Sequence, residues 1–335
     1  MEKEEAVLFS LSATPDLAQA IAARLDIHLG QRSIRRFPSG EIIVEPNESV
    51  RGKVVYIVQS TCPPVNENLM ELMIFVDALK RASAKEINVI IPYFGYARQD
   101  RKAKPRQPIT ASLVANLLVT SGVDRVMTVN LHAAQIQGFF SCLVDNLSAI
   151  KLLGYYIMKT HKDLSNICVV SPDHGGVERA RNLAELFNAP LAIIDKRRNN
   201  NLEPEVMAII GDVKGKDCFM IDDMIDTAKS AVNGAKALKA NGAKSVKIAA
   251  VHGVFSDPAA DLLSTGIFDE IIITDSIPLS DKMKKVKNVS VVSLAPMIAD
   301  VIKRITSHKP LTSVYDAYAN PENPEVEIVV KSTTK

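Results

Sequence analysis

The sequence predicts an α/β protein built from doubly wound, mostly parallel sheets. Short apolar runs rich in β-branched residues recur along the chain without alternating apolar and polar positions. Such runs are typical of strands that are covered on both faces. Amphipathic helical patterns separate the runs, and strand–helix alternation of this kind favours right-handed crossovers in one sheet.

The elements follow in order along the chain. Thr14 and Pro15 are suited to the cap and first turn of a helix that runs to Leu25. Apolar residues recur at helical spacing in 66–82 and 109–121, which predicts core-facing helices there. Apolar runs predict strands at 54–60, 87–94, 125–130, 167–173, 191–195, 218–223, 245–253, 270–276 and 289–294.

The length of 335 residues suits two domains of moderate size. Near 151–165 the pattern becomes more polar and then restarts with a strand. We therefore expect an N-terminal α/β domain at 1–150, a C-terminal α/β domain at 151–306 and an extension at 307–335, whose polar, proline-marked end predicts a loose tail.

The composition is that of a soluble globular protein, with 47% hydrophobic and 23% charged residues. A formal net charge of +2 gives no indication of a nucleic-acid or membrane partner. The scattered cysteines lack zinc or redox spacing, and neither a signal peptide nor a membrane-length apolar run is present, so we expect a cytoplasmic protein.

Polar segments follow the predicted strands, at the strand ends where doubly wound sheets bind ligands. Taken singly, a charge run there usually forms a solvated face and one histidine is usually structural. Together, basic residues at several strand ends would neutralise several phosphates. The segments are YFGYARQDRK (93–102), NLHAAQ (130–135), SPDHGG (171–176), DKRRNN (195–200) and DDMIDTAKS (222–230).

His132 and Asp173 would offer one nitrogen and one oxygen to a divalent ion. Magnesium is commonly held by few protein groups together with substrate phosphates, so two ligands suffice.

The pair Asp222–Asp223 suits a sugar diol as hydrogen-bond acceptor, and the following DTAKS turn suits a phosphate at a helix N-terminus. The competing interpretation is the metal-binding acid of a P-loop NTPase, which needs a Gly-Lys-Ser/Thr sequence. Both Gly-Lys pairs are followed by other residues, Val54 and Asp217. The pattern therefore favours a pentose phosphate.

The chain resembles the ribose-phosphate diphosphokinases, or phosphoribosyl pyrophosphate (PRPP) synthases, of the phosphate-activated class. The resemblance runs from about Leu8 to about Thr306. It implies two similar doubly wound domains of phosphoribosyltransferase type. The segments that carry it are FPSGE (37–41), STCPPVNENLMEL (60–72), YARQDRK (96–102), NLHAAQIQGFF (130–140), SPDHGG (171–176), DKRR (195–198) and IDDMIDTA (221–228).

The resemblance implies that the anomeric hydroxyl of ribose 5-phosphate attacks the β-phosphorus of ATP, giving PRPP and AMP for nucleotide biosynthesis. It implies Mg2+ as cofactor, and ATP and ribose 5-phosphate as ligands. It also implies a homo-oligomer, a hexamer in this family, with sites shared between subunits. The N-terminal domain would supply the ATP motif and subunit contacts, and the C-terminal domain the ribose 5-phosphate site and catalytic loop.

The site residues implied by the resemblance fall into five groups. ATP would be bound by Phe37, Ser39, Glu41, Arg98 and Gln99, of which Phe37 and Glu41 would reach the adenine of a neighbouring subunit. His132 and Asp173 would hold the metal, and Lys196 and Arg198 would act from a mobile catalytic loop. Ser49 and Arg51 match the regulatory phosphate site. Ribose 5-phosphate would be bound by Asp222, Asp223, Asp226, Thr227, Ala228, Lys229 and Ser230.

The chain departs from the family pattern at Lys229, where the phosphate loop usually has glycine, at Ser39, where Asp or Asn is usual, and in NNNLEP after DKRR. Lys229 would cost about 1–2 kcal/mol at a left-handed position, or add a cation beside the phosphate. Two alternatives stay open: a non-catalytic regulatory homologue, and a phosphoribosyltransferase with a similar acid–turn motif.

Overall fold

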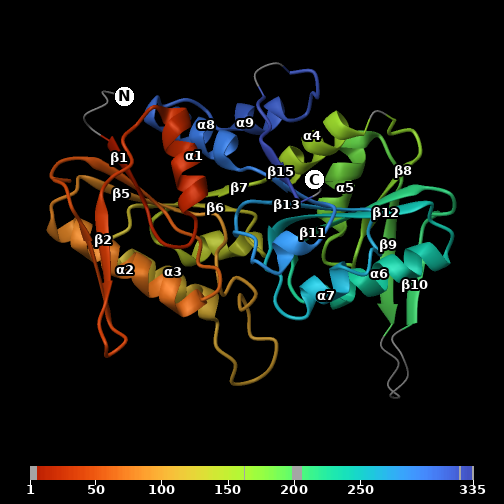
Figure 1. Cartoon of the computed structure of the whole chain (residues 1–335), viewed down its shortest axis with the longest axis horizontal. Helices are drawn as coiled ribbons and strands as arrows, with labels where there is room; N and C mark the ends of the chain where they lie inside the picture. Colours follow the sequence, from red (N-terminus) through yellow and green to blue (C-terminus); the bar gives the residue numbers. More distant parts are fainter. Residues whose placement is uncertain (1–5, 162, 198–205, 324–325, 334–335) are drawn as a thin grey trace. The chain divides into compact units, whose positions relative to one another are not determined.

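A computed structural model describes residues 6–161, 163–197, 206–323 and 326–333 (Figure 1). The chain forms two compact units. The first contains Met1–Ser148, Ser276–Pro278 and Leu294–Leu311. The second contains Ala149–Asp275, Leu279–Ser293 and Thr312–Lys335. Each unit therefore includes segments that are distant in sequence.

The first unit is built on a 5-stranded sheet in the order β1-β4-β5-β6-β7. All its neighbouring strands pair in parallel, as the non-alternating apolar runs predict. Their bounds are β1 (Ala6–Ser10), β4 (Val54–Val58), β5 (Glu86–Ile91), β6 (Arg125–Val129) and β7 (Leu143–Leu147).

Helices cover both faces of this sheet (Figure 1). Val7 and Phe9 of β1 point into one core with the apolar residues of α2 and α3, while α1 packs against α8. An antiparallel hairpin, β2–β3, projects from the unit. The remaining elements of this unit are α1 (Pro15–Leu25), β2 (Arg32–Arg36), β3 (Ile42–Pro46), α2 (Val65–Arg81), α3 (Thr110–Ser121), the 3-10 helix η1 (Ala134–Phe139) and α8 (Ala295–Thr306).

The second unit is built on an 8-stranded sheet in the order β10-β9-β8-β11-β12-β13-β14-β15. Its two edge strands run antiparallel to their neighbours and the inner pairs are parallel. The strands are β8 (Ile167–Ser171), β9 (Leu191–Arg197), β10 (Val206–Ile210), β11 (Asp217–Ile225), β12 (Ser245–Gly253), β13 (Glu270–Thr274), β14 (Val289–Val292) and β15 (Val330–Ser332).

One face of this sheet forms a core with Val232, Ala235 and Leu238 of α6 and with α7. The helices α4 and α5 pack against each other, and α5 packs against β8. The bounds are α4 (Ile150–Thr160), α5 (Val177–Phe187), α6 (Lys229–Ala240), α7 (Ala259–Leu263), η2 (Met283–Lys285) and α9 (Thr312–Ala317).

The predicted α/β class with mostly parallel sheets is confirmed, and every predicted strand overlaps an observed one. The sequence patterns missed β1, β7, β10 and β15 and the β2–β3 hairpin. Among the described helices, none is both long and apolar enough to cross a membrane.

Candidate active site

The tip of the β2–β3 hairpin carries three of the predicted ATP-binding residues. Phe37 is 43% exposed, and the guanidinium carbon of Arg35 lies 5.9 Å from the centre of its ring. Ser39 Oγ donates to Glu41 Oε2 over 2.8 Å. The serine at this position therefore orients the Glu41 carboxylate, and Phe37 offers an aromatic face to solvent.

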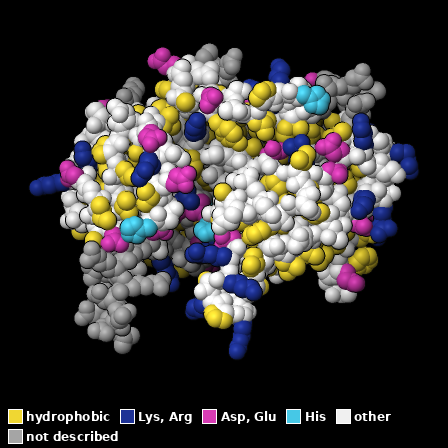
Figure 2. All heavy atoms as spheres, turned by 180° about the vertical axis from the view of Figure 1, so that it is seen from behind, with side chains coloured by type: hydrophobic (Ala, Val, Ile, Leu, Met, Phe, Trp, Pro, Cys, Tyr) yellow, Lys and Arg dark blue, Asp and Glu magenta, His cyan; other side chains and the backbone are white. Residues whose placement is uncertain are grey.

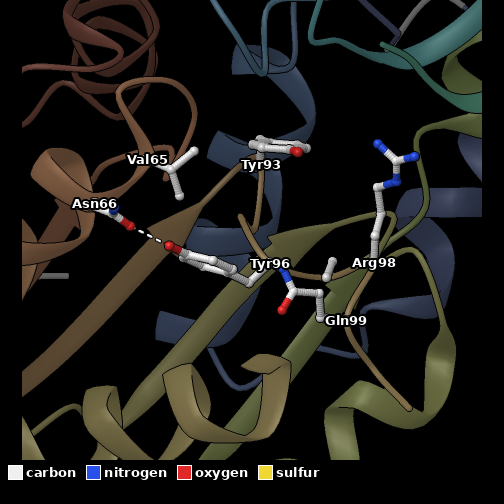
Figure 3. A pocket seen from close by; sticks show the side chains of 7 residues that line it. Val65, Asn66, Tyr93, Tyr96, Arg98 and Gln99 are labelled. Atoms are coloured by element: carbon white, nitrogen blue, oxygen red, sulfur yellow. Dashed lines mark hydrogen bonds between the residues drawn. The ribbon is translucent and has the colours of Figure 1, made fainter. Parts of the chain in front are cut away.

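The segment that follows β5 carries Arg98 and Gln99. Both line a cavity of about 460 Å3 together with Val65, Asn66, Tyr93, Tyr96 and Ala97 (Figure 3). In Figure 3 the Arg98 side chain extends away from the Tyr96 ring. Gln99 Oε1 accepts a hydrogen bond of 2.5 Å from Thr110 Oγ1 at the start of α3. The cavity combines aromatic walls with polar groups, as small-molecule sites do.

Gly95 allows this segment to approach the segment after β4. A Cβ at Gly95 would lie 2.4 Å from the Thr61 carbonyl oxygen, and the Gly95 N–H donates to Thr61 Oγ1 over 2.6 Å. The next residue, Tyr96, has a φ of 66° and donates its hydroxyl hydrogen to Asn66 Oδ1. A positive φ at an aromatic residue is strained, and surrounding contacts hold it in place.

Beyond Gln99 the chain becomes strongly basic before α3 begins. Arg101, Lys102, Lys104 and Arg106 are all exposed, and Figure 2 shows Lys and Arg side chains gathered on a projecting segment. Charges of one sign at the mouth of a site attract anions such as nucleotide phosphates.

His132 lies directly after β6 and is exposed. Its neighbour Leu131 donates its N–H to Asn146 Oδ1 over 3.0 Å. Gln135 Nε2 donates to Asp100 Oδ2 over 2.9 Å, which ties this segment to the one that carries Arg98. The structure thus brings the segments after β5 and β6 together.

The predicted regulatory residues lie between β3 and β4. Ser49 and Arg51 are both exposed. Arg51 Nη1 donates to Ser83 Oγ over 3.0 Å, so a serine that the sequence patterns missed lies beside the predicted pair.

In the second unit, Asp173 follows β8 and is exposed. Its Oδ1 accepts the N–H of Gly176 over 3.0 Å, and Ser171 Oγ donates to its carbonyl oxygen over 2.7 Å. A Cβ at Gly176 would lie 3.0 Å from Ser171 Oγ, so the turn that presents this carboxylate leaves little room for a side chain.

Lys196 lies in β9, and Arg198 falls outside the described residues. The strand is joined to the loop after β8 by His174, whose Nε2 lies 3.0 Å from Asp195 Oδ1. This contact links the neighbours of two predicted site residues, Asp173 and Lys196.

Asp222 and Asp223 lie in the part of β11 that extends past β8. Arg179 of α5 contacts both, with Nη1 2.8 Å from Asp222 Oδ1 and Nη2 3.4 Å from Asp223 Oδ1. Burial, followed by the hydrogen bond and charge of the Asp223 side chain, raises the pKa of Asp222 to about 7, although the charge of Arg179 lowers it. The acid pair therefore changes charge near neutral pH.

The turn after β11 ends at Ala228, which has a φ of 61° and caps α6. Lys229 is the first residue of α6 and is exposed. The left-handed position is thus Ala228, and the backbone cost considered for Lys229 does not arise. Asp226 and Thr227 are half-buried in the turn, and Ser230 is exposed. The first N–H groups of a helix lack intrahelical acceptors, so this end of α6 suits an anion.

The chain is similar over most of its length to proteins named ribose-phosphate pyrophosphokinase. The model of the N-terminal domain of ribose phosphate pyrophosphokinase matches residues 6–122, and that of the phosphoribosyl synthetase-associated domain matches residues 199–316. A ribose-phosphate pyrophosphokinase of Fusobacterium nucleatum is 51% identical over 309 residues, 92% of this chain and 98% of the relative. The chain belongs to the ribose-phosphate pyrophosphokinase family.

Other relatives agree. The ribose-phosphate pyrophosphokinase of Haemophilus influenzae is 51% identical over 311 residues, 92% of this chain and 98% of that protein. A crystal structure of phosphoribosylpyrophosphate synthetase from Mycobacterium smegmatis has a TM-score of 0.86 at 43% identity, covering 91% of this chain and 99% of that one. The family resemblance stated from the motifs is confirmed, and these names favour a catalytic ribose-phosphate pyrophosphokinase over a regulatory homologue.

Several residues of the candidate site escaped the sequence patterns. Arg179 lies on α5, whose sequence pattern is that of an ordinary amphipathic helix. Asn66 and Tyr96 contact each other from segments that are distant in sequence. A signal existed for Gly95 and Gly176, because glycines directly after strands often mark close approach, but it does not identify what approaches.

Proposed function

We propose that this chain transfers the β,γ-diphosphate of ATP to the 1-hydroxyl of ribose 5-phosphate, giving PRPP and AMP. The observation that carries the proposal is at the end of β11. Asp222 and Asp223 supply carboxylates for a sugar diol, and the turn Asp226–Ser230 follows at the start of α6, where a phosphate is favoured. One pentose phosphate would use both.

The first unit supplies the proposed ATP site. Arg98 and Gln99 line the aromatic cavity after β5, and the exposed basic segment beyond them suits the triphosphate. We propose that Phe37, Ser39 and Glu41 serve the adenine of a neighbouring subunit in a homo-oligomer, a hexamer by resemblance. The exposure of Phe37 at a hairpin tip supports this, because a large exposed aromatic side chain suits an interface.

Little covalent work falls to the protein in this transfer, which depends on in-line placement and charge neutralisation. Asp222 and Asp223 would orient the ribose so that its 1-hydroxyl oxygen faces the β-phosphorus. The hydroxyl proton passes to solvent water as the new oxygen–phosphorus bond forms. Lys196 and Arg198 would meet the charge that develops on the transferred group. AMP departs with the oxygen that joined its phosphorus to the β-phosphorus.

We propose Mg2+ as the cofactor, with His132 and Asp173 as its ligands. A carboxylate is a ligand type that magnesium prefers, and the Gly176 N–H bond orients that of Asp173. In the described ranges, no group of three or more His, Cys, Asp or Glu side chains could hold a metal ion, which fits an ion held largely by substrate phosphates. When bound, Mg2+ neutralises phosphate charge.

We further propose that Ser49 and Arg51 bind a regulatory phosphate, with the Arg51–Ser83 contact as support. The proposed division of labour places ATP and subunit contacts in 1–150, the ribose 5-phosphate site in 151–306 and an extension in 307–335. A cytoplasmic location is part of the same proposal.

Phosphorus NMR of the purified protein with ATP, ribose 5-phosphate and Mg2+ tests the function. We expect equal amounts of AMP and PRPP. Asp223→Asn should lower kcat/KM for ribose 5-phosphate about tenfold or more, because it removes a charged acceptor. The exposed Asp281 is the control, and Asp281→Asn should match the wild type. Binding of either substrate without product would instead indicate the regulatory homologue.

A further inference from the structure

Arg179 makes one contact to each acid of the proposed ribose subsite. Its side chain is 19% exposed, and it reaches Asp222 Oδ1 at 2.8 Å and Asp223 Oδ1 at 3.4 Å. Consecutive residues of a strand normally point to opposite faces of the sheet. Here one guanidinium contacts both carboxylates. Arg179 therefore holds the two side chains closer together than the pleat of the strand alone would place them.

The ends of the strands explain how Arg179 gains access. β11 pairs with β8 from Asp217 to Met220, whereas its pairing with β12 continues to Ile225. Past Met220, β11 no longer pairs with β8, and the turn and helix that follow β8 lie on that side of the strand. Arg179 lies in the first turn of that helix, α5.

Gly176 lies between the start of α5 and the end of β8. A Cβ there would lie 3.0 Å from Ser171 Oγ, which is tight, and 3.6 Å from Arg179 Nη1, which is an ordinary van der Waals distance. Residue 176 is itself buried, so the guanidinium packs beside it in the interior of the unit.

The orientation of Asp222 is fixed by two donors on the same oxygen. Oδ1 accepts Arg179 Nη1 over 2.8 Å and the Asp223 N–H over 2.8 Å. Charge-assisted bonds of this kind are stronger than neutral ones, and the planar guanidinium limits the angles that its partners can take.

The charges also favour a cation here. Two neighbouring carboxylates repel each other; burial and the side chain of Asp223 raise the pKa of Asp222, while the charge of Arg179 and the Asp223 N–H lower it. Loss of Arg179 would thus leave a pair that keeps a proton to higher pH.

We propose that Arg179 is a positioning residue of the ribose subsite, which holds the Asp222 and Asp223 carboxylates in the orientation that accepts the ribose hydroxyls. This inference rests on the proposed function, in which those two acids bind ribose 5-phosphate. Arg179 itself acts through the acids and needs no contact with substrate.

The test compares Arg179→Gln, Arg179→Lys and a matched control, Arg181→Gln, on the same helix. Arg181 is exposed. Ribose 5-phosphate affinity is measured by calorimetry on the full protein, alongside steady-state kinetics from pH 6 to 9. For Arg179→Gln we expect Kd and KM for ribose 5-phosphate to rise at least about tenfold, with a smaller fall in kcat.

The other variants refine the result. Arg179→Lys keeps the charge but loses the planar fork, so an intermediate loss is expected. In Arg179→Gln the pH at which ribose 5-phosphate affinity is half-maximal should move upward. Arg181→Gln should stay within about twofold of the wild type.

Wild-type affinity in Arg179→Gln, with an unmoved pH profile, would overturn the proposal. If that variant instead loses ATP affinity and thermal stability as well, Arg179→Ala with added ethylguanidinium decides the matter. Recovery of ribose 5-phosphate affinity supports positioning, and its absence refutes it. Calorimetry measures ribose 5-phosphate binding directly. A wild-type protein that binds ribose 5-phosphate without making PRPP would therefore refute the proposed function, but the effect of Arg179 on binding could still be tested.

Discussion

The charge of Asp222 changes near neutral pH. Its pKa is raised to about 7, chiefly by burial. Hydroxyl donors bind an ionised carboxylate better than a protonated one. We therefore expect KM for ribose 5-phosphate to fall as the pH rises from about 6 to about 8.

Ribose 5-phosphate has a phosphate that also titrates, with a second pKa near 6, so the control is Asp222→Asn, which should lose the component near pH 7. An identical pH profile in both proteins would contradict the assignment.

The raised pKa of Asp222 also makes stability depend on pH. The folded state keeps the Asp222 proton to about pH 7, while the unfolded state loses it near pH 4. The contribution of this carboxyl to the free energy of unfolding should thus decline between those values.

Lys229 stands exposed at the start of α6, at the proposed phosphate site. Because its backbone is helical, Lys229→Gly removes a cation without relieving strain. We expect KM for ribose 5-phosphate to rise about two- to fivefold, since exposed ion pairs contribute about 0–1 kcal/mol, with little change in kcat. Lys236→Ala, also exposed on α6, is the control. An equal fall in kcat at unchanged affinity would refute this role.

At the residue scale, the sequence predicted the polar residues at the ends of strands but not the residues of other elements that contact them. Asp222 and Asp223 were predictable because paired acids after a buried apolar run need a partner. Arg179, 43 positions from Asp222, was not, because nothing local distinguishes a helix arginine that binds an acid from a solvated one.

The segment between β5 and α3 depends on Gly95 for its path. A Cβ there would lie 2.4 Å from the Thr61 carbonyl oxygen, which is backbone and cannot rotate away. Gly95→Ala should lower stability by about 1–3 kcal/mol and displace Arg98 and Gln99, raising the Kd for ATP. Thermal unfolding and ATP calorimetry measure both effects.

Gly138→Ala is the matched control, since a Cβ there meets nothing within 4 Å. It should leave both stability and ATP affinity unchanged. ATP binding at wild-type strength in Gly95→Ala would show that the path of this segment does not form the ATP site.

At the scale of elements, apolar runs located the central strands because burial on both faces removes the need for alternation. Some of the missed strands have mixed composition: β2 (Arg32–Arg36) is largely charged, and β7 (Leu143–Leu147) contains two polar residues. β15 has only three residues, all of them exposed. Such strands are defined by their pairing partners, which one sequence does not show.

At the scale of the whole molecule, the division into units was less visible in the sequence than the fold class. Helix α8 follows β14 of the second unit, yet it belongs to the first unit, where it packs against α1. An amphipathic pattern predicts that a helix has a buried face but does not predict which sheet or helix covers it.

In the proposed function, the end of β11 binds the diol and the phosphate of one ribose 5-phosphate for diphosphoryl transfer. The most direct measurement is the rate of AMP release from ATP with ribose 5-phosphate, 2-deoxyribose 5-phosphate or ribose as acceptor. We expect kcat/KM to fall at least about tenfold for each analogue, because each leaves charged or polar groups of the site unpaired. Equal rates with all acceptors, or AMP release without any acceptor, would contradict it.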